Sequence, residues 1–335
     1  MKLGSLKSRS LDGELCVISR DLKWGLKATN IAPSLREAVE RWDEVESKLQ
    51  FIYQQLNAEK RPPGTFVVNE KDFFSALPRT FLFADGSAFI HHIKLVRMAR
   101  KAPLPETLTT VPLMYQAESA SFHAPLDPIP QVDFKHGTDF EAEVGVITAQ
   151  VPIGTSAEEA LKKIRLLVLI NDVSLRGLIP EELAAGFGFF VSKPTKTLSP
   201  FAITPDELGE SWQEGRVHLP LLVNYNSQFF GKANAKEMHF HFGQLIAHAC
   251  QTRPLAAGTL IGSGTVANEN SEMGSSCLAE KRMLEQINDG EIKTPFMKEG
   301  DTIEISMKGL QGQDLFGRIF QRVEKWPPSR GAISN

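Results

Sequence analysis

The sequence predicts an α+β fold that is rich in β-structure and carries a small N-terminal domain. From Phe81 onward, short strand-like segments predominate and helical segments are few. Near the N-terminus, residues 34–57 instead have apolar side chains at helical spacing. The chain has no P-loop, no internal repeat and no G-x-G-x-x-G after a first strand. A doubly wound nucleotide-binding fold is therefore not expected.

The N-terminal segment combines paired strands with a helix. Residues 14–28, "ELCVISRDLKWGLKA", indicate two short strands. Ser34 followed by Glu37 has the form of a capping box, which marks a helix start. The helical face consists of Leu35, Val39, Trp42, Val45, Leu49, Ile52 and Leu56. The turn "KRPPG" ends this part, so we expect a domain over residues 1–78 and a second over 79–330.

In the second part, apolar and alternating segments predict a series of strands. "LLVLIND" (166–172) is a short apolar run, preceded by a helix that a second capping box, Ser156 with Glu159, would open. "HFGQLIAHACQTRP" (241–254) predicts a short helix that Pro254 ends. Further strands are expected at 218–226, 302–307 and 315–323.

Composition excludes several classes of function. The 37 basic and 40 acidic side chains give a net charge of −3, which is unlike the basic footprint of a nucleic-acid-binding protein. No apolar run approaches the ~20 residues that span a bilayer, and the first residues lack the apolar core of a signal peptide. Three scattered cysteines do not indicate a disulfide framework. We therefore expect a cytoplasmic protein without nucleic-acid or membrane partners.

The stretch "TDFEAEVGVI" (138–147) contains closely spaced acidic residues. Read as one strand, it places Asp139, Glu141 and Glu143 on one face, because successive side chains alternate. Asp172 ends the apolar run 166–172, where an ionised carboxylate is costly unless it is paired or bound to metal. Asp85 lies in the turn-like "FADGSAF". Carboxylates without His or Cys in their spacing would select a hard cation such as Mg²⁺ or Ca²⁺.

Five motifs, in order, resemble the fumarylacetoacetate hydrolase family. They are "DFEAEVGVI", "LINDVSLRGL", "FGFFVSKP", "GTLIGSGTV" and "CLAEKR", and the resemblance covers about residues 81–325. It implies a mixed β-sandwich roll, and the first 78 residues look like the extra domain of the long bacterial members. It also implies a homodimer and a divalent metal held by four carboxylates, which match Asp85, Glu141, Glu143 and Asp172. Asp139 matches no ligand, and we expect it to be solvated or hydrogen-bonded.

The resemblance further implies a histidine and carboxylate pair that activates water. Counting from Asp85 leads to His92 in "AFIHHIKLVRMARK", which we interpret as a strand with His91 on its opposite face. A register slip by one residue would exchange the two histidines. The partner acid would be Glu280 of "CLAEKR". Imidazole suits this task because it titrates near neutral pH.

Other matched positions concern the substrate. Lys193 and Arg176 match catalytic cations of the family, Thr265 and Tyr115 match substrate-contacting residues, and either Arg97 or Arg100 would bind a distal carboxylate. Two positions depart from the animal members. Ile179 replaces a glutamine donor, for which Gln116 is one candidate substitute, and Ser87 replaces an aromatic residue.

Three functional hypotheses follow from these residues. The first is metal-dependent hydrolysis of a carbon–carbon bond in a 1,3-diketo acid, specifically fumarylacetoacetate to fumarate and acetoacetate in tyrosine and phenylalanine catabolism. The second is another reaction of the family: oxo-acid decarboxylation, hydration or isomerisation, or acylpyruvate hydrolysis. The third is a metal-stabilised binding protein without turnover.

Overall fold

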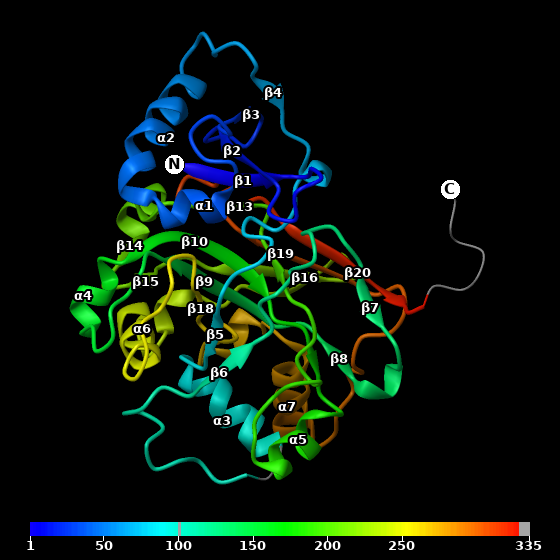
Figure 1. Ribbon diagram of the computed structural model, residues 1–335. Helices are drawn as coiled ribbons and strands as arrows, with labels where there is room; N and C mark the ends of the chain where they lie inside the picture. Colours follow the sequence, from blue (N-terminus) through cyan, green and yellow to red (C-terminus); the bar gives the residue numbers. More distant parts are fainter. Residues whose placement is uncertain (100–101, 328–335) are drawn as a thin grey trace.

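The N-terminal part of the chain is a small antiparallel sheet covered by two helices (Figure 1). The structure is a computed structural model that describes residues 1–99 and 102–327. The predicted strand pair within residues 14–28 is present, and β1 and β4 flank it. The elements are β1 (Lys2–Leu6), β2 (Glu14–Ile18), β3 (Trp24–Lys27), α1 (Leu35–Glu40), α2 (Trp42–Leu56) and β4 (Phe66–Val67).

The predicted helix over residues 34–57 is divided in two. Ser34 caps α1, as expected, because its hydroxyl accepts a hydrogen bond from the backbone N–H of Glu37 at 3.3 Å. Arg41 then leaves helical geometry, with φ −114° and ψ 29°, and α2 starts at the next residue. The apolar positions still face one core, in which Leu35 and Leu49 are fully buried.

A large mixed sheet runs from this N-terminal part into the rest of the chain. β1 pairs with β13, so the sheet order is β4-β3-β2-β1-β13-β10-β9-β18-β5-β6, and β12 also pairs with β10. The division at residue 78 stays a prediction, because strand pairing is continuous across it. The further strands are β5 (Phe83–Gly86), β6 (Met114–Ala117), β9 (Ala142–Thr148), β10 (Ile164–Asn171), β12 (Thr197–Leu198), β13 (Phe201–Ile203) and β18 (Leu260–Gly262).

A five-stranded sheet packs against one face of the large one. Its order is β17-β16-β19-β20-β7, and all neighbours are antiparallel except β20 and β7. Two strand pairs, β8 with β11 and β14 with β15, lie outside both sheets. These strands are β7 (Ile129–Gln131), β8 (Thr138–Asp139), β11 (Ser174–Leu175), β14 (Trp212–Gln213), β15 (Arg216–Val217), β16 (Leu221–Tyr225), β17 (Gln228–Gly231), β19 (Thr302–Met307) and β20 (Ile319–Lys325).

Alternation along β10 explains why its sequence is almost continuously apolar. Leu167 and Leu169 pack into the core shared with the five-stranded sheet, whereas Val168 and Ile170 face the N-terminal helices. Both faces of the strand are therefore buried, and every position favours an apolar side chain. The β-rich α+β fold expected from the sequence is confirmed.

The remaining helices lie at the margins of the sheets. Figure 1 shows α3, α5 and α7 gathered beyond one end of the large sheet, where α3 packs against α7, while α4 and α6 pack together at another edge. Among the described residues, every helix is too short or too polar to cross a membrane. These helices are α3 (Ile90–Ala99), α4 (Ala157–Leu161), α5 (Ile179–Ala185), α6 (Phe242–Ala249) and α7 (Leu278–Asp289).

Three strand predictions were wrong in detail. Residues 138–147 do not form one strand: β8 pairs with β11, and after Phe140 the chain changes partner and enters β9. The segment that contains His91 and His92 is helix α3, which packs against α7. Of residues 315–323, only those from Ile319 onward belong to a strand.

Candidate active site

Three of the predicted carboxylates meet at one end of the large sheet. Asp85 is on β5 and Glu143 on β9, with β18 between these strands, and Asp172 directly follows β10. Gly262 of β18 leaves room for the acids. A Cβ atom there would lie 2.2 Å from Asp85 Oδ1 and 3.1 Å from Glu143 Oε2. Only glycine therefore allows both carboxylates to turn toward the same point.

The three carboxylates of this cluster carry charges of the same sign and lie close together. Oxygen atoms of Asp85, Glu143 and Asp172 lie within 4.8 Å of one another, and all three side chains are buried. Burial, reinforced by the neighbouring carboxylates, raises the pKa of Glu143 well above its usual range and that of Asp85 to about 8. Among the described residues, no N–H or O–H group donates to either Glu143 oxygen. An all-oxygen set of this kind fits a hard divalent cation.

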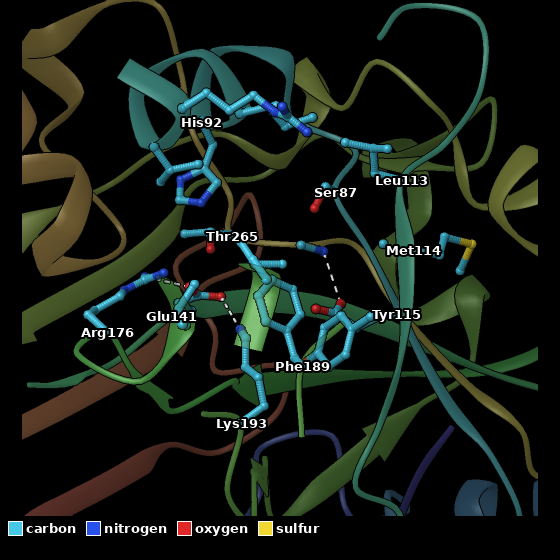
Figure 2. A pocket seen from close by; sticks show the side chains of 18 residues that line it. Ser87, His92, Leu113, Met114, Tyr115, Glu141, Arg176, Phe189, Lys193 and Thr265 are labelled. Carbon is cyan, nitrogen blue, oxygen red and sulfur yellow. Dashed lines mark hydrogen bonds and ion pairs between the residues drawn. The ribbon is translucent and has the colours of Figure 1, made fainter. Parts of the chain in front are cut away.

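Glu141, the fourth predicted ligand, is paired with cationic side chains. One oxygen forms an ion pair with Arg176 Nη2, and the other lies 3.1 Å from Lys193 Nζ. Burial acts to raise the pKa of Glu141, but the charges of Arg176 and Lys193 hold it well below its ordinary value. Figure 2 shows Glu141 between these two residues. The structure thus places Glu141 next to the three-carboxylate cluster, with its charge already neutralised.

Asp172 links the carboxylates to a second buried lysine that sequence reasoning missed. Lys193 Nζ is paired with one Asp172 oxygen, and Lys196 Nζ lies 2.8 Å from the other. The Tyr115 hydroxyl, 3.0 Å from both oxygens, donates to the same carboxylate. Lys196 is fully buried, and burial lowers its pKa. Its position in "SKPTK", three residues after Lys193, is the only sequence signal that could have indicated it.

Asp139 anchors the helix that carries Glu280. Its carboxylate is fully buried and accepts hydrogen bonds from the backbone N–H groups of Leu278, at 2.7 Å, and Ala279, at 2.9 Å. It also accepts from Arg176 Nε at 2.9 Å. An anion is favoured at a helix N-terminus. Of the two expectations for Asp139, hydrogen bonding is the observed one.

Replacing Asp139 with asparagine is expected to lower the free energy of unfolding by about 3 kcal/mol, because a buried ion pair then loses one partner. Urea denaturation measures this loss. Asp133→Asn is the matched control, since Asp133 also accepts a backbone N–H, from Lys135, but is exposed. Equal stability of the two variants would contradict the anchoring role of Asp139.

The histidine and glutamate predicted to activate water lie together. His92 on α3 and Glu280 on α7 have polar atoms within 4.8 Å of each other, and both side chains are buried. Burial raises the pKa of Glu280 to about 8. His91 instead borders a separate surface pocket with Glu237, His239 and Glu269. Because the segment is a helix, the register slip that would exchange the two histidines does not arise.

A cavity of about 230 Å³ opens next to these groups. One part of its wall is polar and includes His92 and Thr265, which Figure 2 shows on the same side as Glu141. The other part is apolar. The complete lining is Asp85, Gly86, Ser87, His92, Ile93, Val96, Arg97, Leu113, Met114, Tyr115, Glu141, Arg176, Ile179, Leu183, Phe189, Lys193, Gly264 and Thr265.

The remaining substrate residues are placed as follows. Arg97 lines the cavity and donates from Nη1 to the backbone oxygen of Pro103 at 2.6 Å, whereas Arg100 lies outside the described residues. The Tyr115 ring packs edge-on against Phe189, with ring centres 5.1 Å apart. Gln116 is exposed on the opposite face of β6 from Tyr115, so it does not replace the glutamine missing at Ile179.

Comparison with known families decides the relationship of this chain. Residues 82–324 match the family model described as fumarylacetoacetate (FAA) hydrolase C-terminal, and residues 1–79 match fumarylacetoacetase N-terminal domain 2. The chain belongs to the fumarylacetoacetate hydrolase family. The resemblance seen in the five sequence motifs is therefore confirmed.

Proteins that are similar to this chain differ in their named reactions. A 2,4-didehydro-3-deoxy-L-rhamnonate hydrolase of Sphingomonas sp. (strain SKA58) is 28% identical over 230 residues, 67% of each chain. A fumarylacetoacetate hydrolase of Exiguobacterium antarcticum has a TM-score of 0.66 at 16% identity, covering 97% of this chain and 99% of that one. The maleylpyruvate hydrolase of Sphingobium sp. SYK-6, solved with manganese(II) and pyruvate, has a TM-score of 0.63 at 14% identity, covering 97% and 99%.

Proposed function

We propose that this protein is a divalent-metal-dependent hydrolase that cleaves the carbon–carbon bond of a 2,4-dioxo acid, releasing pyruvate and a carboxylic acid. The observation that carries the proposal is the three-carboxylate cluster beside His92 and Glu280, next to one cavity. The enolised form of a 2,4-dioxo acid presents neighbouring oxygen atoms, which suit a hard cation. The names of two relatives, a 2,4-didehydro-3-deoxy sugar acid hydrolase and a maleylpyruvate hydrolase, describe substrates of this class.

Asp85, Glu143 and Asp172 would hold the cation, with Glu141 as the fourth candidate ligand that the family resemblance adds. A bound divalent cation supplies Lewis acidity at the oxo groups and stabilises the negative charge of the departing enolate. The three ligands approach from β5, β9 and the end of β10, so their positions are fixed by strand pairing. A rigid sheet of this kind keeps the site pre-organised.

The chain's own residues would carry the proton transfers. A ring nitrogen of His92 takes a proton from water, and Glu280 in its ionised form stabilises the resulting imidazolium. The hydroxide oxygen adds to carbon 4 of the substrate and forms a tetrahedral alkoxide. Lys193, Arg176 and the hydroxyl of Thr265 are the donors at the cavity wall for this oxygen. The bond between carbons 3 and 4 then breaks, its electron pair passes to the enolate, and His92 returns the proton to carbon 3.

Fumarylacetoacetate cleavage, with its place in tyrosine and phenylalanine catabolism, is the second candidate. Arg97 favours it, because a guanidinium at the cavity wall suits the distal carboxylate of such a substrate. Ile179 and Ser87 at the wall speak against it, since they replace the glutamine and the aromatic residue of the animal members. Acylpyruvates with a distal carboxylate would use Arg97 equally well.

The test is a substrate panel with Mg²⁺ or Mn²⁺: acetylpyruvate, maleylpyruvate, fumarylacetoacetate and oxaloacetate. We expect loss of diketone absorbance together with one pyruvate per substrate consumed for the two acylpyruvates, and no turnover in a chelator. Faster cleavage of fumarylacetoacetate would favour the second candidate. Turnover of oxaloacetate alone would overturn both.

Replacing Arg97 with methionine is expected to raise KM for maleylpyruvate about 10-fold or more, because a charge-assisted hydrogen bond contributes about 1.5–3 kcal/mol. KM for acetylpyruvate, which lacks the distal carboxylate, should stay unchanged. Lys94→Met is the control, since Lys94 is exposed on the same helix. If Arg97→Met raised both KM values equally, Arg97 would not bind the distal carboxylate.

A further inference from the structure

A cysteine lies beside the histidine and glutamate of the proposed mechanism and has no part in it. Cys277 precedes α7, and its Sγ accepts a hydrogen bond from the backbone N–H of Glu280 at 3.4 Å. The Cys277 sulfur, a ring nitrogen of His92 and a carboxylate oxygen of Glu280 lie within 4.8 Å of one another. All three side chains are buried.

Within this group, Glu280 has unused binding capacity. Only 1% of Glu280 is exposed, and its buried Oε2 atom receives no hydrogen bond from the described residues. A buried polar atom of this kind is costly unless a ligand or ion satisfies it. A carboxylate oxygen of Glu280 lies within 4.8 Å of the nitrogen of His92 and the sulfur of Cys277, so one ion could bind all three.

We propose that His92, Cys277 and Glu280 form a second cation site that takes a soft divalent ion such as Zn²⁺, and that its occupation inhibits the enzyme. One nitrogen, one sulfur and one carboxylate oxygen form a donor set that zinc uses in proteins, with a fourth position left open to water. Thiolate ligands select zinc over magnesium, calcium or manganese. The thiol gives up its proton on binding, so the ion is held by one thiolate, one carboxylate and one neutral imidazole.

This site differs in chemistry from the three-carboxylate cluster. That cluster offers only oxygen atoms and favours a hard cation, whereas the sulfur of Cys277 gives the second site its selectivity. His92 lines the cavity, whereas Cys277 and Glu280 lie outside its lining. An ion on His92 occupies the lone pair that would accept the proton of water, so the bound ion and base catalysis exclude each other.

The decisive probe is Cd²⁺, a zinc substitute whose bond to a thiolate gives a charge-transfer band in the ultraviolet. The protein is first saturated with Mg²⁺ and then titrated with Cd²⁺. We expect the band in the wild type and in Cys250→Ser, which removes a buried thiol elsewhere in the fold, and its absence in Cys277→Ser. Serine is a favoured N-cap residue, so α7 should keep its start. Thermal melting followed by circular dichroism checks the fold of both variants.

The same variants test inhibition, separately from the identity of the substrate. For whichever substrate is turned over, the Zn²⁺ concentration that halves the rate should be at least about 10-fold higher for Cys277→Ser than for the wild type and Cys250→Ser. A band that persists in Cys277→Ser, or a wild type without the band, would overturn the proposal. Equal zinc sensitivity of all three proteins would do the same. Failure of the substrate panel leaves the Cd²⁺ result unaffected.

Discussion

Replacing Glu143 with glutamine should abolish turnover and, at the same time, stabilise the metal-free protein. Both effects have one cause: Glu143 is a buried carboxylate that has no hydrogen-bond donor among the described residues, and it lies next to Asp85 and Asp172. Loss of a ligand weakens the cation site, which stabilises the negative charge of the transition state. A loss of about 4 kcal/mol of this stabilisation lowers the rate of turnover on the order of 1,000-fold. Without metal, the neutral amide removes repulsion that the carboxylate imposes on its neighbours.

The effect of Glu143 on the stability of the metal-free protein should depend on pH, and its sign follows from the raised pKa values. In the folded protein the pKa of Asp85 is raised to about 8 and that of Glu143 is also raised, whereas unfolded carboxyl groups titrate near about pH 4. The folded chain therefore binds more protons than the unfolded chain between these values. The free energy of unfolding of the metal-free protein should fall as pH rises from about 4 to about 8, by on the order of a few kcal/mol. A divalent cation should reverse this loss.

Urea denaturation in a chelator, at a series of pH values, measures the effect. Glu143→Gln should show a flatter decline than the wild type and should be on the order of 2 kcal/mol more stable near pH 8. The comparison is needed because Glu280, with its pKa raised to about 8, contributes a decline of the same sign in both proteins. Parallel curves for the two proteins would show that the carboxylate cluster is not repulsive.

Glu285→Gln provides a control of opposite sign. Glu285 is also buried, but its carboxylate accepts hydrogen bonds from the backbone N–H groups of Lys293 and Thr294, each at 2.8 Å. Its pKa is lowered, because a hydrogen bond from the Thr294 hydroxyl, together with these two backbone hydrogen bonds, outweighs burial. Replacing Glu285 should therefore destabilise the protein whether or not metal is present, and should leave metal affinity unchanged.

His92→Gln is expected to lower kcat about 1,000-fold, because positioned general bases contribute about 100- to 10,000-fold. Metal affinity, measured by calorimetry with Mn²⁺, should not change, since the carboxylate cluster is intact. The matched control is His91→Gln, which alters the adjacent residue of the same helix. His91 is half-buried against a different pocket, so its replacement should change kcat by less than about 2-fold.

Either of two results would contradict this assignment. If His92→Gln kept its rate within about 10-fold of the wild type, another group would be the base. If His91→Gln lost as much activity as His92→Gln, the effect would come from disturbance of α3. Loss of metal binding in His92→Gln would place the imidazole in the cation site.

Much of the fold could be predicted because local sequence patterns, such as apolar runs and helix caps, determine its strands and helices. The apolar run before Asp172 is a strand buried on both faces, and residues 302–307 form β19 as expected. Ser34 begins a helix, as its spacing from Glu37 indicates. The segment around His92 shows where such reasoning fails, since a short apolar stretch with two adjacent histidines has no clear period. Its packing against α7, far along the chain, belongs to the tertiary structure.

For the site, the sequence by itself determined which residue types are present and in what order. That order of motifs was enough to indicate the family. Matching the motifs led to Glu280 and the four acids, and counting from Asp85 led to His92. Only the tertiary structure decided which acids form the carboxylate cluster and which acid is paired with cationic side chains. Glu141 and Glu143 are two residues apart, yet Glu141 pairs with Arg176 and Lys193 while Glu143 meets Asp85 and Asp172. Asp139 likewise finds its partner at Leu278, 139 residues away. The physical reason is that spacing fixes the face on which a side chain lies, whereas its pKa and its role depend on the charges that distant segments bring to that face.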